Sequence, residues 1–78
     1  MNNNNIIVYS TVVCPYCTMA KKLLQEKSLS YTEILVDQDT EAREKMVALS
    51  GRTSVPQIFM DDKHIGGYDD LRAYFKKS

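Results

Sequence analysis

Two cysteines stand where a strand-forming run meets the start of a helix, and their placement constrains the fold more than any other feature. Residues 6–9 read Ile-Ile-Val-Tyr, a short β-branched and aromatic run that predicts a buried central strand. Cys14 follows after a short turn, and Pro15 suits a helix's first turn, where its missing N–H is harmless. That helix should run to about residue 27 and bury one face: Met19, Ala20, Leu23 and Leu24.

The segment after this helix again alternates strand and helix. Residues 31–36 predict a second strand, and residues 37–40 offer cap residues for a second helix. Gly51 predicts where that helix stops. We expect its apolar face to consist of Ala42, Met46 and Leu49.

A hairpin and a final helix complete the expected fold. Residues 57–60 and 63–65 should pair as strands across a turn at Asp61-Asp62. The inward face of the last helix should hold Leu71, Tyr74 and Phe75. A βαβ unit followed by a ββα unit is the minimal thioredoxin fold, an α/β protein with a four-stranded mixed sheet flanked by three helices.

Size and charge narrow the functional classes. Seventy-eight residues allow one domain, 1–78, in which residues 1–5 should form a disordered lead-in. Ten basic and ten acidic residues give zero net charge without runs, so neither nucleic acid nor a membrane is expected as a partner. No apolar stretch approaches the roughly 20 residues of a spanning helix. We expect a cytoplasmic monomer.

The cysteine pair points to redox chemistry. At the N-terminus of a helix, Cys14 would face free N–H groups that favour the thiolate, which is the attacking form in disulfide exchange. Cys17 lies one turn further on and suits a resolving role. Half of a zinc site is the alternative, but a closed site needs four ligands and the chain adds only His64. We expect His64 to be an exposed strand residue, and we expect no residue of the protein to bind a metal ion.

Two further segments have the character of a ligand site. Pro56 precedes the third strand, and we predict a cis Val55-Pro56 bond that frees the Val55 backbone to pair with an extended ligand. A loop proline without any ligand role is the alternative. Gly66-Gly67 would let a ligand approach the helix that follows, whose N–H groups suit a carboxylate. Asp69 or Asp70 could hold an ammonium group, or both could merely cap the helix.

Three motifs together resemble the dithiol glutaredoxins: Cys14-Pro15-Tyr16-Cys17, residues 52–59 and residues 64–71. The resemblance implies glutathione as co-substrate, with no tightly bound cofactor. It also implies the glutathione contacts Tyr16, Ser54, Val55, Pro56, Gly67, Tyr68, Asp69 and Asp70. Family members commonly carry a lysine three residues before the first cysteine, where this chain has Thr11. Arg43 and Arg52 are the candidates for supplying that charge.

The same resemblance implies a mechanism. Cys14 would attack a protein disulfide, Cys17 would displace the mixed disulfide, and glutathione would reduce the enzyme. For glutathionylated proteins, Cys14 alone would take the glutathionyl group and pass it to a second glutathione. Two rivals remain: a thioredoxin-like reductant recycled by a flavoprotein, and a binding module that holds a [2Fe–2S] cluster between two chains through Cys14 and glutathione. Pro15 disfavours the cluster.

Overall fold

A computed structural model describes residues 5–77 of the chain. The expected lead-in, residues 1–5, lies outside the described residues except for Asn5. The Asn5 N–H donates to Asp61 Oδ1 (2.8 Å), and the Asn5 carbonyl accepts from the Asp61 N–H (2.9 Å). Asn5 and Asp61 therefore extend the pairing of the first and third strands by one residue.

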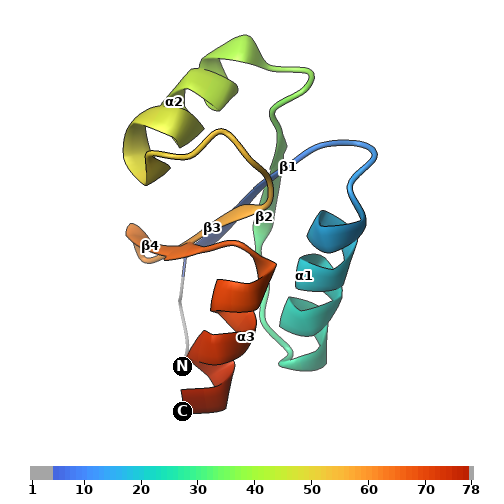
Figure 1. The fold of residues 1–78 in the computed structure, drawn as a ribbon. Helices are drawn as coiled ribbons and strands as arrows, with labels where there is room; N and C mark the ends of the chain where they lie inside the picture. Colours follow the sequence, from blue (N-terminus) through green and yellow to red (C-terminus); the bar gives the residue numbers. More distant parts are fainter. Residues whose placement is uncertain (1–4, 78) are drawn as a thin grey trace.

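The strands and helices follow the predicted order (Figure 1). They are β1 (Ile6–Ser10), α1 (Pro15–Glu26), β2 (Thr32–Leu35), α2 (Thr40–Ser50), β3 (Gln57–Met60), β4 (Lys63–Gly66) and α3 (Tyr68–Lys77). The sheet order is β2-β1-β3-β4, with β1 parallel to β2 and the other pairs antiparallel. The predicted minimal thioredoxin fold is confirmed. None of the helices within residues 5–77 is both long and apolar enough to cross a membrane.

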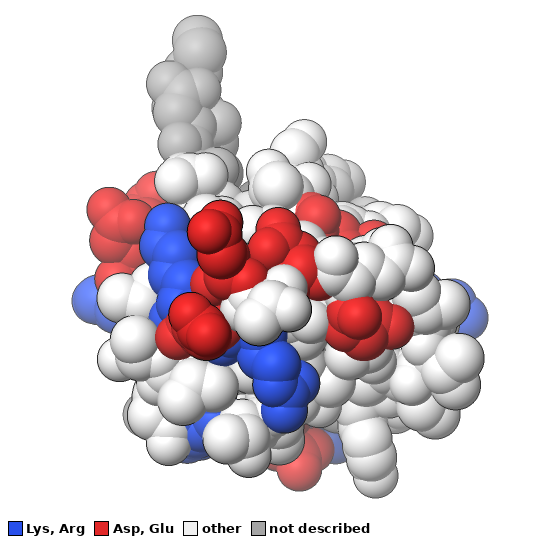
Figure 2. Space-filling model, turned by 90° about the horizontal axis from the view of Figure 1, so that it is seen from above, with Lys and Arg blue, Asp and Glu red and all other residues white. Residues whose placement is uncertain are grey.

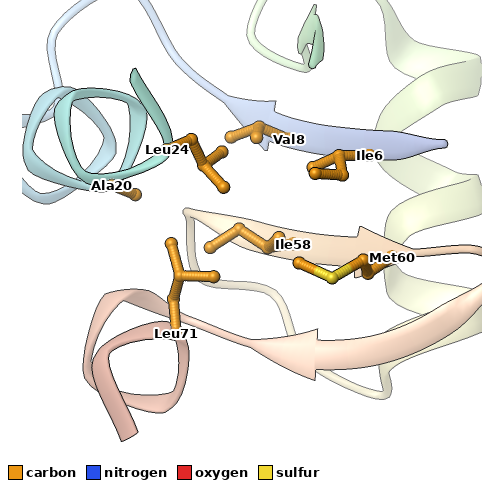
Figure 3. Packing of buried hydrophobic residues seen from close by; sticks show 7 residues of the cluster. All are labelled: Ile6, Val8, Ala20, Leu24, Ile58, Met60 and Leu71. Atoms are coloured by element: carbon orange, nitrogen blue, oxygen red, sulfur yellow. The ribbon is translucent and has the colours of Figure 1, made fainter. Parts of the chain in front are cut away.

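One face of the sheet packs against α1 and α3, which lie side by side in Figure 1. Alternate residues of a strand point to the same face, so β1 and β3 each contribute two side chains to this layer. Figure 3 shows these strand side chains packed against side chains of the two helices. The cluster consists of Ile6, Val8, Ala20, Leu24, Ile58, Met60 and Leu71. This cluster holds α1, and therefore the cysteines, against the sheet.

The opposite face carries a smaller cluster beneath α2. Tyr9 and Phe59 meet edge to face, with ring centroids 5.7 Å apart, and Met46 of α2 is fully buried with them. The helix begins at Asp39, whose Oδ1 accepts the Ala42 N–H at 3.1 Å. It ends at Gly51, which adopts the left-handed conformation (φ 72°) expected of a helix stop.

Three side chains expected in the core are exposed instead. The exposed fractions are 41% for Met19, 54% for Leu49 and 43% for Tyr74. The fully buried stripe of α1 is narrow and consists of Cys17, Ala20 and Leu24. Leu49 lies in the last turn of α2. In this helix, Met46 is the only fully buried residue. Helical spacing predicted which side of each helix faces the core, but it predicted too many residues on that side.

An ion pair joins α1 to the edge strand β2. Lys21 Nζ lies 2.6 Å from Glu33 Oε2, and the hydroxyl of buried Ser10 donates to the same oxygen at 2.6 Å. These bonds, first that from Lys21 and then that from Ser10, lower the pKa of the Glu33 carboxyl. The contact ties together the two parallel strands and the helix that carries the cysteines.

We predict that Leu24→Ala lowers the free energy of unfolding by about 2–5 kcal/mol, because it empties space in a packed interior. The matched control is Leu49→Ala, the same change at an exposed position, for which we expect a change within about 0.5 kcal/mol. Urea denaturation of both variants measures the difference. Equal losses would contradict the packing described here.

Candidate active site

Cys14 is the N-cap residue of α1. Its backbone is extended (φ −156°, ψ 100°), and its Sγ accepts the Cys17 N–H at 3.2 Å. Such N–H groups have no partner within the helix, and they carry the positive end of its dipole. The backbone therefore offers Cys14 a hydrogen bond and a favourable field, both of which stabilise a thiolate.

The two sulfurs form a disulfide but differ in exposure. Cys14 and Cys17 are bonded, with their Cα atoms 5.2 Å apart. Cys17 is 1% exposed, whereas Cys14 is partly exposed, and nearby Val13 and Tyr16 are exposed as well. An incoming disulfide can reach Cys14, and it cannot reach Cys17 without rearrangement.

The sheet topology brings the three motifs to one edge. Tyr9 near the end of β1 pairs with Gln57 at the start of β3, and Ile58 pairs with Gly66 at the end of β4. The loops that follow β1, precede β3 and follow β4 therefore lie together. The surface seen from above the view of Figure 1 carries acidic and basic side chains interspersed among uncharged ones (Figure 2).

A groove of about 300 Å³ joins these loops. It is lined by Tyr16, Arg52, Ser54, Val55, Pro56, Gln57, Gly67, Tyr68 and Asp69. The predicted cis bond between Val55 and Pro56 is confirmed. The Val55 carbonyl oxygen lies 4.0 Å from Cys14 Sγ, so the groove reaches the disulfide. The rings of Tyr16 and Tyr68, from different motifs, stand with centroids 6.1 Å apart.

Every predicted contact residue lines this groove except Asp70. Its Oδ2 accepts the Gly67 N–H at 3.0 Å and pairs with Arg52 Nη1 at 3.2 Å. An acidic side chain that reaches back from the third helical residue is one half of a capping box. The Gly67 bond and then Arg52 lower the pKa of the Asp70 carboxyl. Gly66 (φ 123°) is required beneath it, because a Cβ there would collide with the Asp70 side chain.

The groove contains one basic residue among the described residues that line it, Arg52. Arg43, the other candidate for the missing positive charge, lies on α2 in a separate hollow with Thr40 and Val47. Thr11 is not part of the lining, and its hydroxyl donates to the Val13 carbonyl at 3.4 Å. Of the two candidates, the fold places only Arg52 at the groove.

Two residues of the site were not anticipated as such. Gln57 is 1% exposed, lines the groove and donates to the Ser54 carbonyl at 3.1 Å. His64, expected to be exposed, is partly buried: its Nε2 lies 2.7 Å from Gln57 Oε1, and its ring lies 4.9 Å from that of Phe59. Burial, then the charge of Arg52, lower the pKa of His64. The sequence signal that could have indicated this contact is Gln57 itself, a polar residue at the start of an otherwise apolar strand.

Metal ligands do not gather at this site. Within the part of the chain that the structure describes, no three His, Cys, Asp or Glu side chains lie together in a group that could hold a metal ion.

Comparison with known proteins gives a consistent result. A family model described as glutaredoxin matches residues 6–65. The chain is 51% identical over 69 residues to Glutaredoxin 3 of Escherichia coli strain K12, covering 88% of this chain and 83% of that protein. It is 44% identical over 68 residues to a glutaredoxin of Pseudomonas aeruginosa, covering 87% and 81%. The crystal structure of a buckwheat glutaredoxin-glutathione complex superposes with a TM-score of 0.85 at 30% identity, covering 95% of this chain and 70% of that one.

We predict that, in the reduced protein, limiting iodoacetamide near neutral pH labels Cys14 well before Cys17. The helix terminus stabilises the Cys14 thiolate, and burial shields Cys17. Peptide mapping by mass spectrometry measures both sites in one sample, so each cysteine controls for the other. Equal labelling would contradict the assigned asymmetry.

Proposed function

The chain belongs to the glutaredoxin family of thiol oxidoreductases, and from this we propose that it uses glutathione to reduce protein disulfides and glutathione-protein mixed disulfides. One observation carries the proposal: a groove lined by all three motifs ends beside the accessible sulfur of the Cys14–Cys17 pair. That arrangement suits a small peptide thiol delivered to one sulfur.

For a protein disulfide, both cysteines take part. The Cys14 thiolate attacks one substrate sulfur, forming a mixed disulfide and releasing the other sulfur as a thiolate that takes up a proton. The Cys17 thiolate then attacks Cys14 Sγ, which frees the reduced substrate and leaves the Cys14–Cys17 disulfide. Two glutathione molecules reduce that disulfide and leave as glutathione disulfide, so two electrons pass to the substrate.

For a glutathionylated protein, Cys14 acts alone. It takes the glutathionyl group, releases the protein thiol, and passes the group to a second glutathione as glutathione disulfide. Glutaredoxin potentials of about −200 to −230 mV lie near the glutathione poise of the cytosol. We therefore propose that the protein acts in the cytoplasm. We further propose that it acts as a monomer.

The groove suggests how glutathione would lie. The Val55 backbone would pair with the cysteinyl residue in the manner of an added strand, close to Cys14. Arg52 would hold the glycyl carboxylate, and the first N–H groups of α3 would hold the γ-glutamyl carboxylate. Asp69 would hold the ammonium group, because it lines the groove whereas Asp70 caps the helix. Tyr16 would cover one side.

We predict that Cys17→Ser retains deglutathionylation and loses most reduction of a protein disulfide. Glutathione can resolve a small adduct on Cys14 unaided, whereas a bulky mixed disulfide needs the internal thiol. The assay couples glutathione to glutathione reductase and uses a glutathionylated peptide and a protein disulfide as parallel substrates. In mass spectra, the variant treated with glutathione disulfide should gain one glutathionyl group, on Cys14.

Cys14→Ser is the control and should abolish both activities. Loss of both activities in Cys17→Ser would overturn the assigned roles. Reduction driven by NADPH and a thioredoxin reductase, with none driven by glutathione, would instead support the thioredoxin-like rival.

We predict that Arg52→Gln raises the KM for glutathione several-fold with little change in kcat, because it removes the cation that lines the groove. The difference should shrink at high salt, as expected for an exposed charge. Arg43→Gln, the same change outside the groove, is the matched control and should leave KM unaltered. Equal effects of the two variants would point to net charge rather than a specific contact.

A further inference from the structure

Gln57 is a buried polar side chain whose amide has partners at both ends. Its Nε2 donates to the Ser54 carbonyl at 3.1 Å and contacts the Ser54 hydroxyl at 3.4 Å. Its Oε1 lies 2.7 Å from His64 Nε2. The side chain therefore spans from the edge strand β4 to the loop that forms one wall of the groove.

Elementary hydrogen bonding fixes the direction of this chain of contacts. The Ser54 carbonyl can only accept, so the NH₂ end of the Gln57 amide must face it. The oxygen end then faces His64, whose Nε2 must carry a proton. Because the Ser54 Oγ accepts from the same NH₂, its own hydroxyl proton remains available to a ligand in the groove.

His64 is held in place from several sides. Its ring lies against Phe59, its cross-strand partner, with centroids 4.9 Å apart. Arg52 and Asp70 are the charged groups that act on it, the first lowering and the second raising its pKa, while burial lowers it most. Either protonation state keeps the Nε2 proton once Gln57 accepts it, so the contact does not depend on charging the ring.

The supported loop lies beside the reacting sulfur. The Val55 carbonyl lies 4.0 Å from Cys14 Sγ, and Val55 stands between Ser54 and Pro56. Gln57 is the first residue of β3, and its side chain holds the Ser54 backbone. It therefore limits how far the neighbouring Val55 backbone can move. In a groove that binds a peptide through that backbone, this anchoring reduces the ordering cost of binding.

We propose that Gln57, oriented by His64, is a positioning residue that sets the affinity of the groove for glutathione. The inference rests on the proposed function, since it concerns how the same groove holds its ligand. Gln57 acts through the 54–56 loop and not on the sulfur, so its loss should affect binding and leave thiol chemistry intact.

Kinetics of Gln57→Met tests the proposal, because methionine keeps the length of the side chain and removes both hydrogen bonds. We expect KM for glutathione to rise about five-fold, the order expected for losing the one hydrogen bond of the two that anchors the Ser54 loop. We expect kcat and the rate of Cys14 alkylation to stay within about two-fold, well below one tenfold step. Gln25→Met is the matched control: its amide also donates a hydrogen bond, to Tyr31 (3.1 Å), away from the groove. An unchanged KM in Gln57→Met, or a fall in alkylation rate instead, would overturn the proposal.

A second measurement needs no variant. His64 is the only histidine in the chain, so its ¹⁵N resonances are unambiguous. Near neutral pH they should report the Nε2–H tautomer, and the Nδ1–H tautomer would overturn the proposal even if Gln57→Met failed to fold. If the wild type and Gln25→Met showed no glutathione-dependent turnover, the proposed function would fail first. If the wild type and Gln25→Met were active and Gln57→Met had an unaltered KM for glutathione, only the positioning role would be rejected.

Discussion

The hydrogen bond from the Cys17 N–H to Cys14 Sγ is the contact on which the site depends. It requires Cys14 to stand outside the first turn of α1 while Cys17 lies inside it. Ala20 and Leu24 fix that helix against the sheet, so the first turn cannot move without disturbing the larger core cluster. The same packing that stabilises the fold therefore sets which sulfur is accessible and which is shielded.

The position of β3 beside β1 is the second constraint. Because the two strands are antiparallel, the end of β1 meets the start of β3, and β4 returns the chain to the same edge. Segments about forty residues apart in the sequence thereby meet at one groove. The pairing of the strands therefore brings these loops together.

Much of this could be predicted, because the decisive patterns are local. The run before Cys14, the turn at Asp61-Asp62 and the stop at Gly51 each act through neighbouring residues. The exposed Met19 and Leu49 could not be predicted, since helical spacing does not say how wide a face the sheet will cover. His64 was misjudged for a related reason: its partner, Gln57, reaches it only through the pairing of β3 with β4. Capping by Asp70 was one of two alternatives that the sequence left open, and the contact with Gly67 favours it.

The groove combines a firmly held stretch of backbone with an exposed ion pair that can rearrange. The buried side-chain amide of Gln57 holds the Ser54 backbone, and breaking its hydrogen bonds would leave buried polar groups unsatisfied. Two residues earlier in the same loop, Arg52 pairs with Asp70 of α3, and both side chains are about half exposed (49% and 50%). Exposed ion pairs contribute little to stability, so a ligand carboxylate can share or replace Asp70 at Arg52 at small cost. In the proposed complex, the anchored Ser54 backbone would fix where the peptide backbone lies, while the exposed Arg52–Asp70 pair would accommodate its charge.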